Sequence, residues 1–428
     1  MGETLATRSA TAMNILLLCG HRLHLRNWVS SGLAAQLPGE VTVVAPLADW
    51  IDMPADIRKS LRFCPLGNPA GAFRTRLRRH LRLGSLVARE PTSVTYRHKL
   101  ANEGRSQWQV ALWRAIRRRH DPEAIGRRIE ALVPPTRDAR AILEAVRPDL
   151  VVWPTLIHTA DDTEVAKAAK AAGIPVMAMP ASWDGLTTKG MFSVRPDRLL
   201  VWGEASRNHA IGDHGFKPEE VEVTGPPHWD IYGHIWPRGD RVLVAGTSLH
   251  YWADERQMVE QLAREALMAG WKIVYRPHPS RLKEDRAWVG TLASVELDSR
   301  LGYDLASGFQ EHIADRVATS ACVVAAFSTL IIEAALLGRP SIIPAFARSA
   351  HGPGGVLTHS LYQHMQSVVE WPGIFLCRTL PGLIGKVRQA VAGRLEYDPG
   401  ELRRRALRVA LADGHAQERI VQAVGRVW

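Results

Sequence analysis

The chain of 428 residues has only four cysteines, Cys19, Cys64, Cys322 and Cys377, and no two of them form a CxxC pair. Such spacing indicates neither a disulfide framework nor a structural zinc site, and it fits a reducing cytoplasm. Long apolar runs are absent as well. The most apolar stretch, residues 321–338, contains Glu333, so we expect a buried strand followed by a helix and no membrane span.

Several motifs are also missing. The first twelve residues lack the apolar core of a secretory signal, and we expect residues 1–12 to form a disordered extension. The sequence has no GxxxxGK[ST] loop, no GxGxxG after the first strand and no HExxH. A DxD-type metal site is not evident, because Asp161 and Asp162 are adjacent and are expected to begin a helix. We therefore expect no metal, no cofactor beyond a nucleotide-activated co-substrate, and metal-independent chemistry.

The composition is that of a globular protein, with 46% hydrophobic and 23% charged residues. The length predicts two sizeable domains. The net charge of +11 favours anionic partners such as nucleotides, phosphorylated substrates or anionic lipid.

Short apolar runs alternate with helical patterns along the chain, which is typical of parallel sheets covered on both faces. After a Pro-rich segment at 226–240 the pattern restarts, which predicts an α/β fold of two doubly wound, Rossmann-like domains facing a cleft. The predicted parts are an N-terminal acceptor domain (13–230), a C-terminal nucleotide-donor domain (231–410) and a C-terminal helix (411–428). The runs taken as strands begin at Asn14, Val41, Leu150, Val176, Arg198, Val242, Lys272, Cys322, Ser341 and Ile374.

Residues 58–128 interrupt this alternation with many arginines and only four acidic residues, in partly amphipathic helical patterns. Such an insertion is a solvated basic face, a membrane-surface helix or an anionic acceptor site. The interleaved Trp and Leu residues make attachment to an anionic membrane surface a serious option. Nucleic acid ranks lower, because no binding motif accompanies the charge.

The run Arg276-Pro277-His278-Pro279 follows a predicted buried strand. Strand ends in such sheets face the ligand cleft, and proline restrains the backbone on both sides of His278. Arg276 offers bidentate contacts to phosphate, and His278 offers a hydrogen bond or a proton to a leaving phosphate. The alternative is an ordinary strand-end loop whose His caps a neighbouring element.

A second run, residues 322–340, predicts a strand that ends near Phe327 and a helix capped by Ser328. The start of that helix offers backbone N–H groups and a positive dipole end to a phosphate. Thr329 and Glu333 share one helix face, and a carboxylate in this apolar helix needs a partner such as ribose hydroxyls. The alternative is a capped helix with one exposed Glu.

Together, the Arg-Pro-His-Pro run and the Glu-bearing helix that ends in Gly-Arg-Pro resemble the C-terminal half of GT-B glycosyltransferases. The nearest groups are the teichoic-acid glycerophosphotransferases and the capsule Kdo transferases. The resemblance implies that Arg276 and His278 contact donor phosphate, that Ser328 and Thr329 cradle it, and that Glu333 meets the ribose.

The N-terminal half adds a second match. The runs 182–190, 196–198 and 201–204 resemble an SWDNLTxKG…PDR…VWxE pattern of glycosyltransferase-like proteins from surface-polysaccharide clusters, although Gly185 replaces the usual Asn. The loop after the first strand is similar to their H-x-R-N run. The residues expected to bind acceptor or sugar are His21, Arg26, Asn27, Ser182, Trp183 and Lys189.

Catalysis of a direct displacement needs a base for the acceptor hydroxyl, and both Asp184 and His24 follow predicted strands. Asp184 is favoured, because the neighbouring Trp183 is expected to exclude water and raise the pKa of that carboxyl; His24 is better suited to orienting a substrate. Thr247 and Ser248 follow the first strand of the second domain, where they either approach donor phosphates or form an ordinary turn.

These features predict a glycosyltransferase that moves a sugar from a CMP-, CDP- or UDP-linked donor to a surface-glycan or lipid-linked acceptor, in the cytoplasm or on the inner face of a membrane. A nucleotide-sugar 2-epimerase of the same fold and a non-catalytic GT-B scaffold at a membrane surface are the alternatives.

Overall fold

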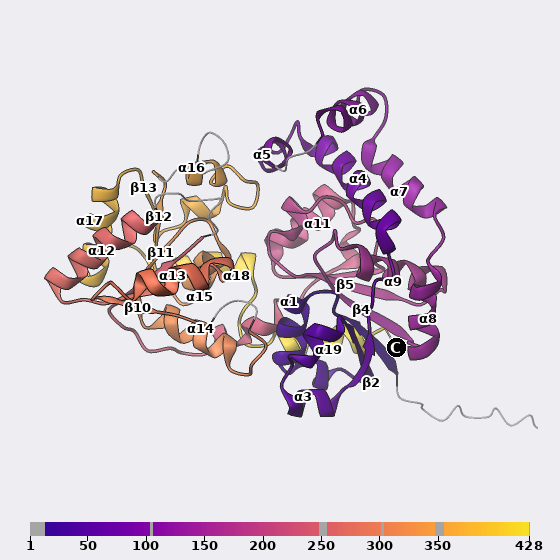
Figure 1. Cartoon of the computed structure of the whole chain (residues 1–428), viewed down its shortest axis with the longest axis horizontal. Coiled ribbons are helices and arrows are strands. Elements are labelled where there is room, and N and C mark those ends of the chain that lie inside the picture. The colour runs from indigo at the N-terminus through magenta and orange to yellow at the C-terminus, as the bar shows by residue number, and fades with distance from the viewer. Residues whose placement is uncertain (1–12, 103–105, 248–254, 301–303, 347–354, 428) are drawn as a thin grey trace, which may run out of the picture.

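The computed structural model describes residues 13–102, 106–247, 255–300, 304–346 and 355–427. The expected extension 1–12 and the candidate Ser248 lie outside these residues. Two parallel sheets, each with helices on both faces, form two domains (Figure 1). The predicted α/β fold of two doubly wound domains is therefore confirmed.

The first domain contains a seven-stranded sheet in the order β3-β2-β1-β4-β5-β6-β7, and every neighbouring pair is parallel. The order reverses direction between β1 and β4. Its strands are β1 (Asn14–Leu18), β2 (Glu40–Ala45), β3 (Arg62–Pro65), β4 (Leu150–Thr155), β5 (Val176–Pro180), β6 (Arg198–Val201) and β7 (Val221–Val223).

The second domain contains a six-stranded parallel sheet in the order β10-β9-β8-β11-β12-β13, which reverses between β8 and β11. The central strands of both sheets are buried except for partly exposed residues at or near their first positions, as their apolar runs require. The strands are β8 (Arg241–Ala245), β9 (Ile273–Arg276), β10 (Val295–Leu297), β11 (Ser320–Ala325), β12 (Ser341–Pro344) and β13 (Ile374–Cys377).

Helices connect the strands of the first sheet. In chain order they are α1 (Arg22–His24), η1 (Leu25–Ser30), η2 (Leu33–Gln36), α2 (Leu47–Ile51), α3 (Ala55–Ser60), α4 (Gly71–Arg89), α5 (Val94–Asn102), α6 (Gln107–Arg117), α7 (Pro122–Leu132), α8 (Arg137–Val146), α9 (Ala160–Ala171), α10 (Gly185–Thr188), α11 (Glu204–His214) and η3 (Pro218–Glu220). As expected, Asp161 and Asp162 lie in the first turn of α9.

The helices from the domain linker onward are η4 (Pro227–Gly233), α12 (Glu255–Ala269), η5 (Pro279–Arg281), α13 (Leu282–Val289), α14 (Phe309–Ala318), α15 (Thr329–Leu336), α16 (Gly355–His359), η6 (Val368–Glu370), α17 (Leu380–Val391), α18 (Pro399–Val409) and α19 (Ala416–Gly425). Among the described residues, no helix is both long and apolar enough to cross a bilayer.

The arginine-rich insertion is helical, but its helices start later than the sequence predicts. Arg62–Pro65 belong to edge strand β3, and the inserted helices are α4 to α7. They enclose a small apolar core of their own that includes Leu86, Tyr96 and Trp113. This core explains the interleaved apolar residues on the inner faces of the helices.

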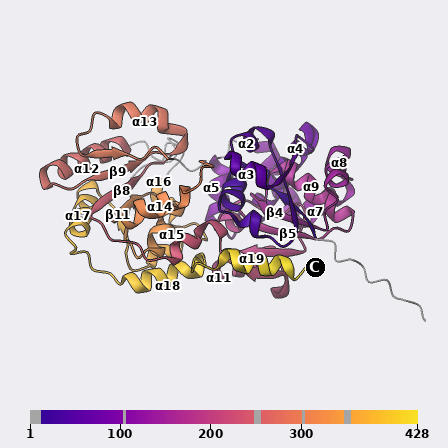
Figure 2. The same cartoon turned by 90° about the horizontal axis from the view of Figure 1, so that it is seen from below.

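Two segments tie the domains together. The loop after α16 reaches the first domain, where the Gln363 side chain donates to Asp213 Oδ2 (2.8 Å) and His364 Nδ1 lies 2.9 Å from the Thr187 hydroxyl. The last helix returns to the first domain, and Figure 2 shows α18 along the second domain and α19 along the first. Asp230 in η4 accepts hydrogen bonds from the first backbone amides of α19.

Candidate functional site

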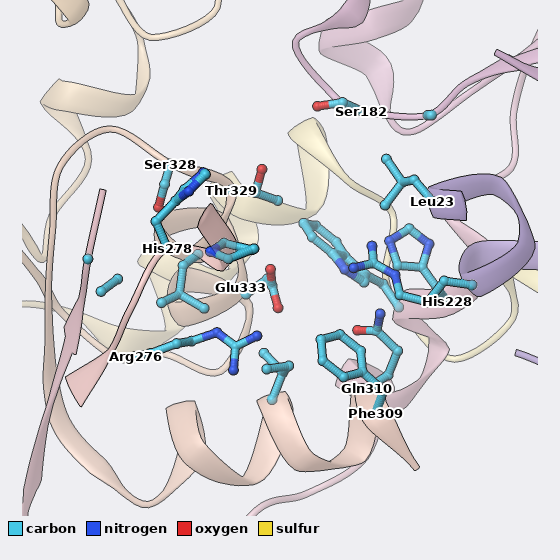
Figure 3. Close-up of a pocket in the computed structure, with 18 of the residues that line it drawn as sticks. Leu23, Ser182, His228, Arg276, His278, Phe309, Gln310, Ser328, Thr329 and Glu333 are labelled. Carbon is cyan, nitrogen blue, oxygen red and sulfur yellow. The ribbon is translucent and has the colours of Figure 1, made fainter. Parts of the chain in front are cut away.

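A crevice of about 330 Å³ lies between the two domains (Figure 3). It opens at the carboxyl ends of the parallel strands, beside the positions where both sheets reverse direction, which is where doubly wound folds bind ligands. Its lining residues are Leu23, Arg26, Ala181, Ser182, Trp202, His228, Trp229, Ala245, Gly246, Arg276, Pro277, His278, Pro279, Phe309, Gln310, Ile313, Ser328, Thr329, Leu330 and Glu333.

Arg276, the last residue of β9, is held rigidly on the second-domain side of the crevice. Its guanidinium donates to Asp298 Oδ2 (2.5 Å) and to the Arg300 carbonyl. Asp298 is buried, yet the Arg276 charge keeps the pKa of this carboxyl below its ordinary value. The ion pair therefore stays charged and fixes the guanidinium at the crevice wall.

His278 follows two residues later and is oriented by the next turn. Its Nδ1 accepts a hydrogen bond from the Ser280 amide (3.3 Å) and lies 2.8 Å from the Ser280 hydroxyl. Because Nδ1 is an acceptor, the neutral ring carries its proton on Nε2. Burial, and secondarily Arg281, lowers the pKa of His278, so the neutral ring presents one N–H donor.

The start of α15 lies across the crevice from Arg276 and His278. Ser328 occupies the N-cap position with extended backbone angles, as predicted, but its side chain makes no capping hydrogen bond. Its Oγ is buried without a hydrogen-bond partner among the described residues. The hydroxyl and the first amides of α15 therefore offer donors to an anion at the positive end of the helix.

Glu333 lies one turn further along α15 and faces the crevice. It accepts a hydrogen bond from the Tyr232 hydroxyl, which comes from η4 in the domain linker. Burial raises the pKa of Glu333, whereas the hydrogen bond from Tyr232 and the charges of Arg26 and Arg276 oppose that rise. Its Oε1 accepts no hydrogen bond from the residues that the structure describes.

Arg26 belongs to the first domain, but its positively charged guanidinium lies on the second-domain side of the crevice. It lies in η1, just after β1, and its guanidinium sits 5.3 Å from the centre of the Phe309 ring in α14. Asn27 is buried and accepts from Arg26 Nε (2.9 Å), so its amide positions the arginine. The other candidate residues of this loop, His21, His24 and Asn27, lie outside the crevice lining. His21 accepts from the Leu23 amide (3.1 Å), and His24 is fully buried with neither ring nitrogen bonded within the described chain.

Of the candidate residues in the loop after β5, Ser182 lines the crevice, beside Ala181, whereas Trp183, Asp184 and Lys189 do not. Trp183 is buried and meets His364 edge-on, and the Lys189 carbonyl accepts from Arg82 Nε (3.2 Å). Asp184 accepts from the Ser182 hydroxyl and from Thr188 Oγ1 (3.0 Å).

The expectation that the pKa of Asp184 is raised is wrong. Burial alone would raise it, but His364, Lys189 and the hydroxyl groups of Ser182 and Thr188 together hold the pKa below its ordinary value. A carboxylate whose charge is stabilised in this way is a weaker base, and it does not line the crevice.

In the loop after β8, Gly246 lies at the crevice, whereas Thr247 lies outside the lining. Gly246 lines the cavity, and its amide donates to the Arg276 carbonyl (2.8 Å). The amide and hydroxyl of Thr247 both donate to Glu255 Oε2 (2.8 and 3.1 Å). Thr247 thus anchors the loop, and its hydroxyl is already engaged.

Seven of the candidate residues meet at the crevice: Arg26, Ser182, Arg276, His278, Ser328, Thr329 and Glu333. Sequence reasoning missed His228, Trp229 and Tyr232, which fold from the Pro-rich linker into the gap between the domains. They follow β7, a three-residue strand that the sequence does not predict, so no strand-end signal marks them. Phe309 and Gln310 begin α14 and carry no comparable signal.

His228 is a polar group aimed into the crevice (Figure 3). It is 5% exposed, its Nδ1 has no partner within the described chain, and its ring packs edge-on against Trp202. Burial, and secondarily Arg26, lowers the pKa of His228 well below its ordinary value, so the imidazole is neutral.

The described residues contain no group of three or more His, Cys, Asp or Glu side chains arranged to hold a metal ion. Metal-independent chemistry stays a prediction.

No protein-family model matches the sequence, and no curated protein matches it. Solved structures do match over nearly the whole chain. The UDP-N-acetylglucosamine 2-epimerase of Neisseria meningitidis, bound to UDP-N-acetylglucosamine, is 14% identical, with a TM-score of 0.56 over 97% of this chain and 100% of that one. The corresponding enzyme of Methanocaldococcus jannaschii is 12% identical, with a TM-score of 0.54 over 97% and 100%. A calicheamicin glycosyltransferase is also 12% identical, with a TM-score of 0.54 over 97% and 98%. These likenesses show that the chain has the GT-B fold.

Proposed function

We propose that the protein binds a UDP-linked sugar in the crevice and transfers the sugar to a surface-glycan or lipid-linked acceptor. The observation that carries the proposal is the convergence of Arg276, His278 and the start of α15 around one cavity, with Glu333 one helical turn away. Solved structures of this fold bind UDP-N-acetylglucosamine, which favours uridine over cytidine among the nucleotides that the sequence leaves open.

The diphosphate would lie between the two second-domain elements. The Arg276 guanidinium and the Nε2–H of His278 supply donors from one side, and Ser328, Thr329 and the amides of α15 supply donors from the other. This arrangement neutralises charge on the leaving UDP without a rearrangement during the reaction, which is how preorganised donors accelerate group transfer. The free Oε1 of Glu333 would accept from ribose hydroxyls.

In the transfer step, an acceptor hydroxyl attacks the anomeric carbon while the bond from that carbon to the phosphate oxygen breaks. UDP leaves with the bonding electron pair, and a base takes the hydroxyl proton. We assign that base to His228 on its position: its ring faces the crevice, whereas Asp184 and His24 lie outside the lining. The lowered pKa of His228 makes it, like Asp184, a weaker base than the free side chain. His278 donates a hydrogen bond from Nε2–H to the leaving phosphate.

A second activity, epimerisation at C2 of a UDP-linked N-acetylhexosamine, is favoured by the similarity to UDP-N-acetylglucosamine 2-epimerases. One experiment separates the two. The purified chain is incubated with UDP-N-acetylglucosamine and no acceptor, and the nucleotide sugar is followed by proton NMR. If the sugar is unchanged, the result supports transfer. If the 2-epimer appears, the protein is assigned as an epimerase and the transferase proposal is rejected.

Titration calorimetry with UDP, CDP and CMP tests the donor site itself. We expect UDP to bind most tightly. A preference for CMP or CDP would correct the nucleotide, and absence of binding by all three would favour a non-catalytic scaffold.

A further inference from the structure

Helix α6 of the arginine-rich insertion has apolar residues on two opposite faces. On the inner face, Val110 and Trp113 are buried, and the Trp113 ring packs so closely on Gly84 of α4 that a Cβ there would lie 2.9 Å from it. On the outer face, Trp108 is 66% exposed and Leu112 is 45% exposed. The inner face accounts for the attachment of α6 to the domain, and the outer face needs another explanation.

The outer apolar residues form one stripe. At roughly 100° per residue, positions 108, 111, 112 and 115 fall within about 100° of the helix circumference, and all four side chains are exposed. Arg118 and Arg119 follow at the end of the helix, are also exposed, and form no ion pair with the acidic residues that the structure describes. By contrast, Arg114 and Arg117 are paired with Glu90.

These six residues define the α6 surface: Trp108, Ala111, Leu112, Ala115, Arg118 and Arg119. α6 lies at the outer edge of the insertion, away from both sheets (Figure 1). Among the described residues, Leu47 and Ile51 in α2 are a second exposed apolar pair, four residues apart, but Asp49 lies between them. Apolar residues that are exposed singly need no explanation. Leu267 and Met268 in α12 form a comparable pair, but Glu260 and Glu265 belong to the same helix.

We propose that the α6 surface is a contact site for a bilayer that contains anionic phospholipid. Trp and Leu side chains on one stripe enter the interface between headgroups and acyl chains, where an amphipathic indole ring is favoured. Arg118 and Arg119 beside them, which form no ion pair with the described acidic residues, neutralise phosphate headgroups. The charge identifies the partner as anionic, and the adjoining apolar stripe identifies it as one with a hydrocarbon interior.

The test is co-sedimentation of the full chain with vesicles of phosphatidylcholine alone or mixed with phosphatidylglycerol. We expect binding only to the mixed vesicles, weakening as salt rises. The double variant Arg118→Ala/Arg119→Ala should lower the partition coefficient by about fivefold for each arginine at low salt. Trp108→Ser/Leu112→Ser should lower it at every salt concentration, and Leu267→Ser/Met268→Ser in α12 is the matched control that should not.

Because all substituted side chains are exposed, thermal unfolding and UDP affinity should stay at the parent values, which separates this proposal from the function of the crevice. Three results would each overturn the proposal: no binding of the parent chain to anionic vesicles, unchanged binding by both α6 variants, or an equal loss in the α12 control. Single-stranded RNA is the competing partner, since exposed aromatic and arginine side chains also bind it. If RNA displaced the vesicles and this competition depended on the same α6 residues, the α6 surface would be assigned to nucleic acid and the membrane proposal would be rejected.

Discussion

The hydroxyl of Tyr232, in the segment that joins the two domains, donates a hydrogen bond to the carboxylate of Glu333 at the floor of the crevice. Tyr232 is completely buried, and Glu333 is 9% exposed. The position of the linker and the orientation of the carboxylate are therefore coupled. A carboxylate that is buried without a donor would be costly, so Tyr232 maintains the charged acceptor that the proposed ribose contact requires.

We predict that Glu333→Gln weakens UDP binding by about tenfold to a hundredfold, the value of one hydrogen bond to a charged group. Calorimetry measures the loss, and Glu284→Gln, on the exposed face of α13, serves as the control with parent affinity. Unchanged affinity in Glu333→Gln would remove the ribose contact from the proposal.

Tyr232→Phe should make UDP binding more sensitive to acid. Burial already raises the pKa of Glu333, and loss of the tyrosine hydrogen bond removes a group that lowers it. The carboxylate then becomes protonated at a higher pH, so affinity falls earlier as the pH is lowered from 8 to about 5. Parallel pH profiles for the parent and the variant would show that Tyr232 does not control the charge of Glu333.

His228 and His24 form a matched pair for testing the base. Each is a buried imidazole with at least one ring nitrogen unbonded within the described chain, but only His228 lines the crevice. We expect His228→Gln to reduce turnover of the UDP-sugar by about two to four orders of magnitude, while UDP affinity changes little. His24→Leu should keep parental turnover. The reverse pattern would assign the catalytic base to His24, in the loop after β1.

His24 should instead control stability in acid. Complete burial, with a smaller contribution from His21, lowers its pKa to about 3 from 6.5. The unfolded chain therefore binds a proton at pH values where the native chain does not. The contribution of His24 is fully present above about pH 6.5 and is lost on acidification, at about 1.4 kcal/mol per pH unit, until the pH reaches about 3. Urea titrations of His24→Leu should show a shallower acid slope than the parent, and equal slopes would contradict this role.

The sequence predicts the fold well because the central strands are short but continuous apolar runs. All ten apolar runs that the sequence predicts as strands are strands in the structure. The three that were missed, β3, β7 and β10, are short strands of three or four residues. β3 includes Arg62 and a proline, and such a sequence carries neither alternation nor a continuous apolar run.

The site is predictable where its residues follow predicted strands, or where a charged side chain interrupts an apolar helix, as Glu333 does in α15. Arg276 and Ser328 follow apolar runs, so their convergence comes from the strand order of one sheet. The position of His228 depends on how a proline-rich linker folds between two domains, and no periodicity encodes that contact. The surroundings of Asp184 differ from the prediction for a similar reason. The neighbouring Trp183 is visible in the sequence, whereas His364 reaches Asp184 from 180 residues away through the loop after α16.

Gly246 provides the last prediction, because it lies where three groups meet. A Cβ at this position would lie 2.8 Å from the Tyr275 hydroxyl, 2.9 Å from Glu255 Oε1 and 3.1 Å from Pro277 Cα. The Tyr275 hydroxyl is fixed between Glu255 (2.5 Å) and Asp285 (3.0 Å), so it cannot move without breaking a buried network.

Gly246→Ala should therefore lower the free energy of unfolding by about 1–3 kcal/mol. It should also weaken UDP binding, because the displaced loop would move Arg276 and Pro277 at the crevice wall. The control is Gly212→Ala in α11, where a Cβ meets nothing within 4 Å. That change should be neutral or stabilising by up to about 1 kcal/mol, because alanine is the better helix former. Urea unfolding and UDP calorimetry on both variants decide the matter. If Gly246→Ala lost stability but kept full UDP affinity, the loop after β8 would be a packing element with no part in holding the donor.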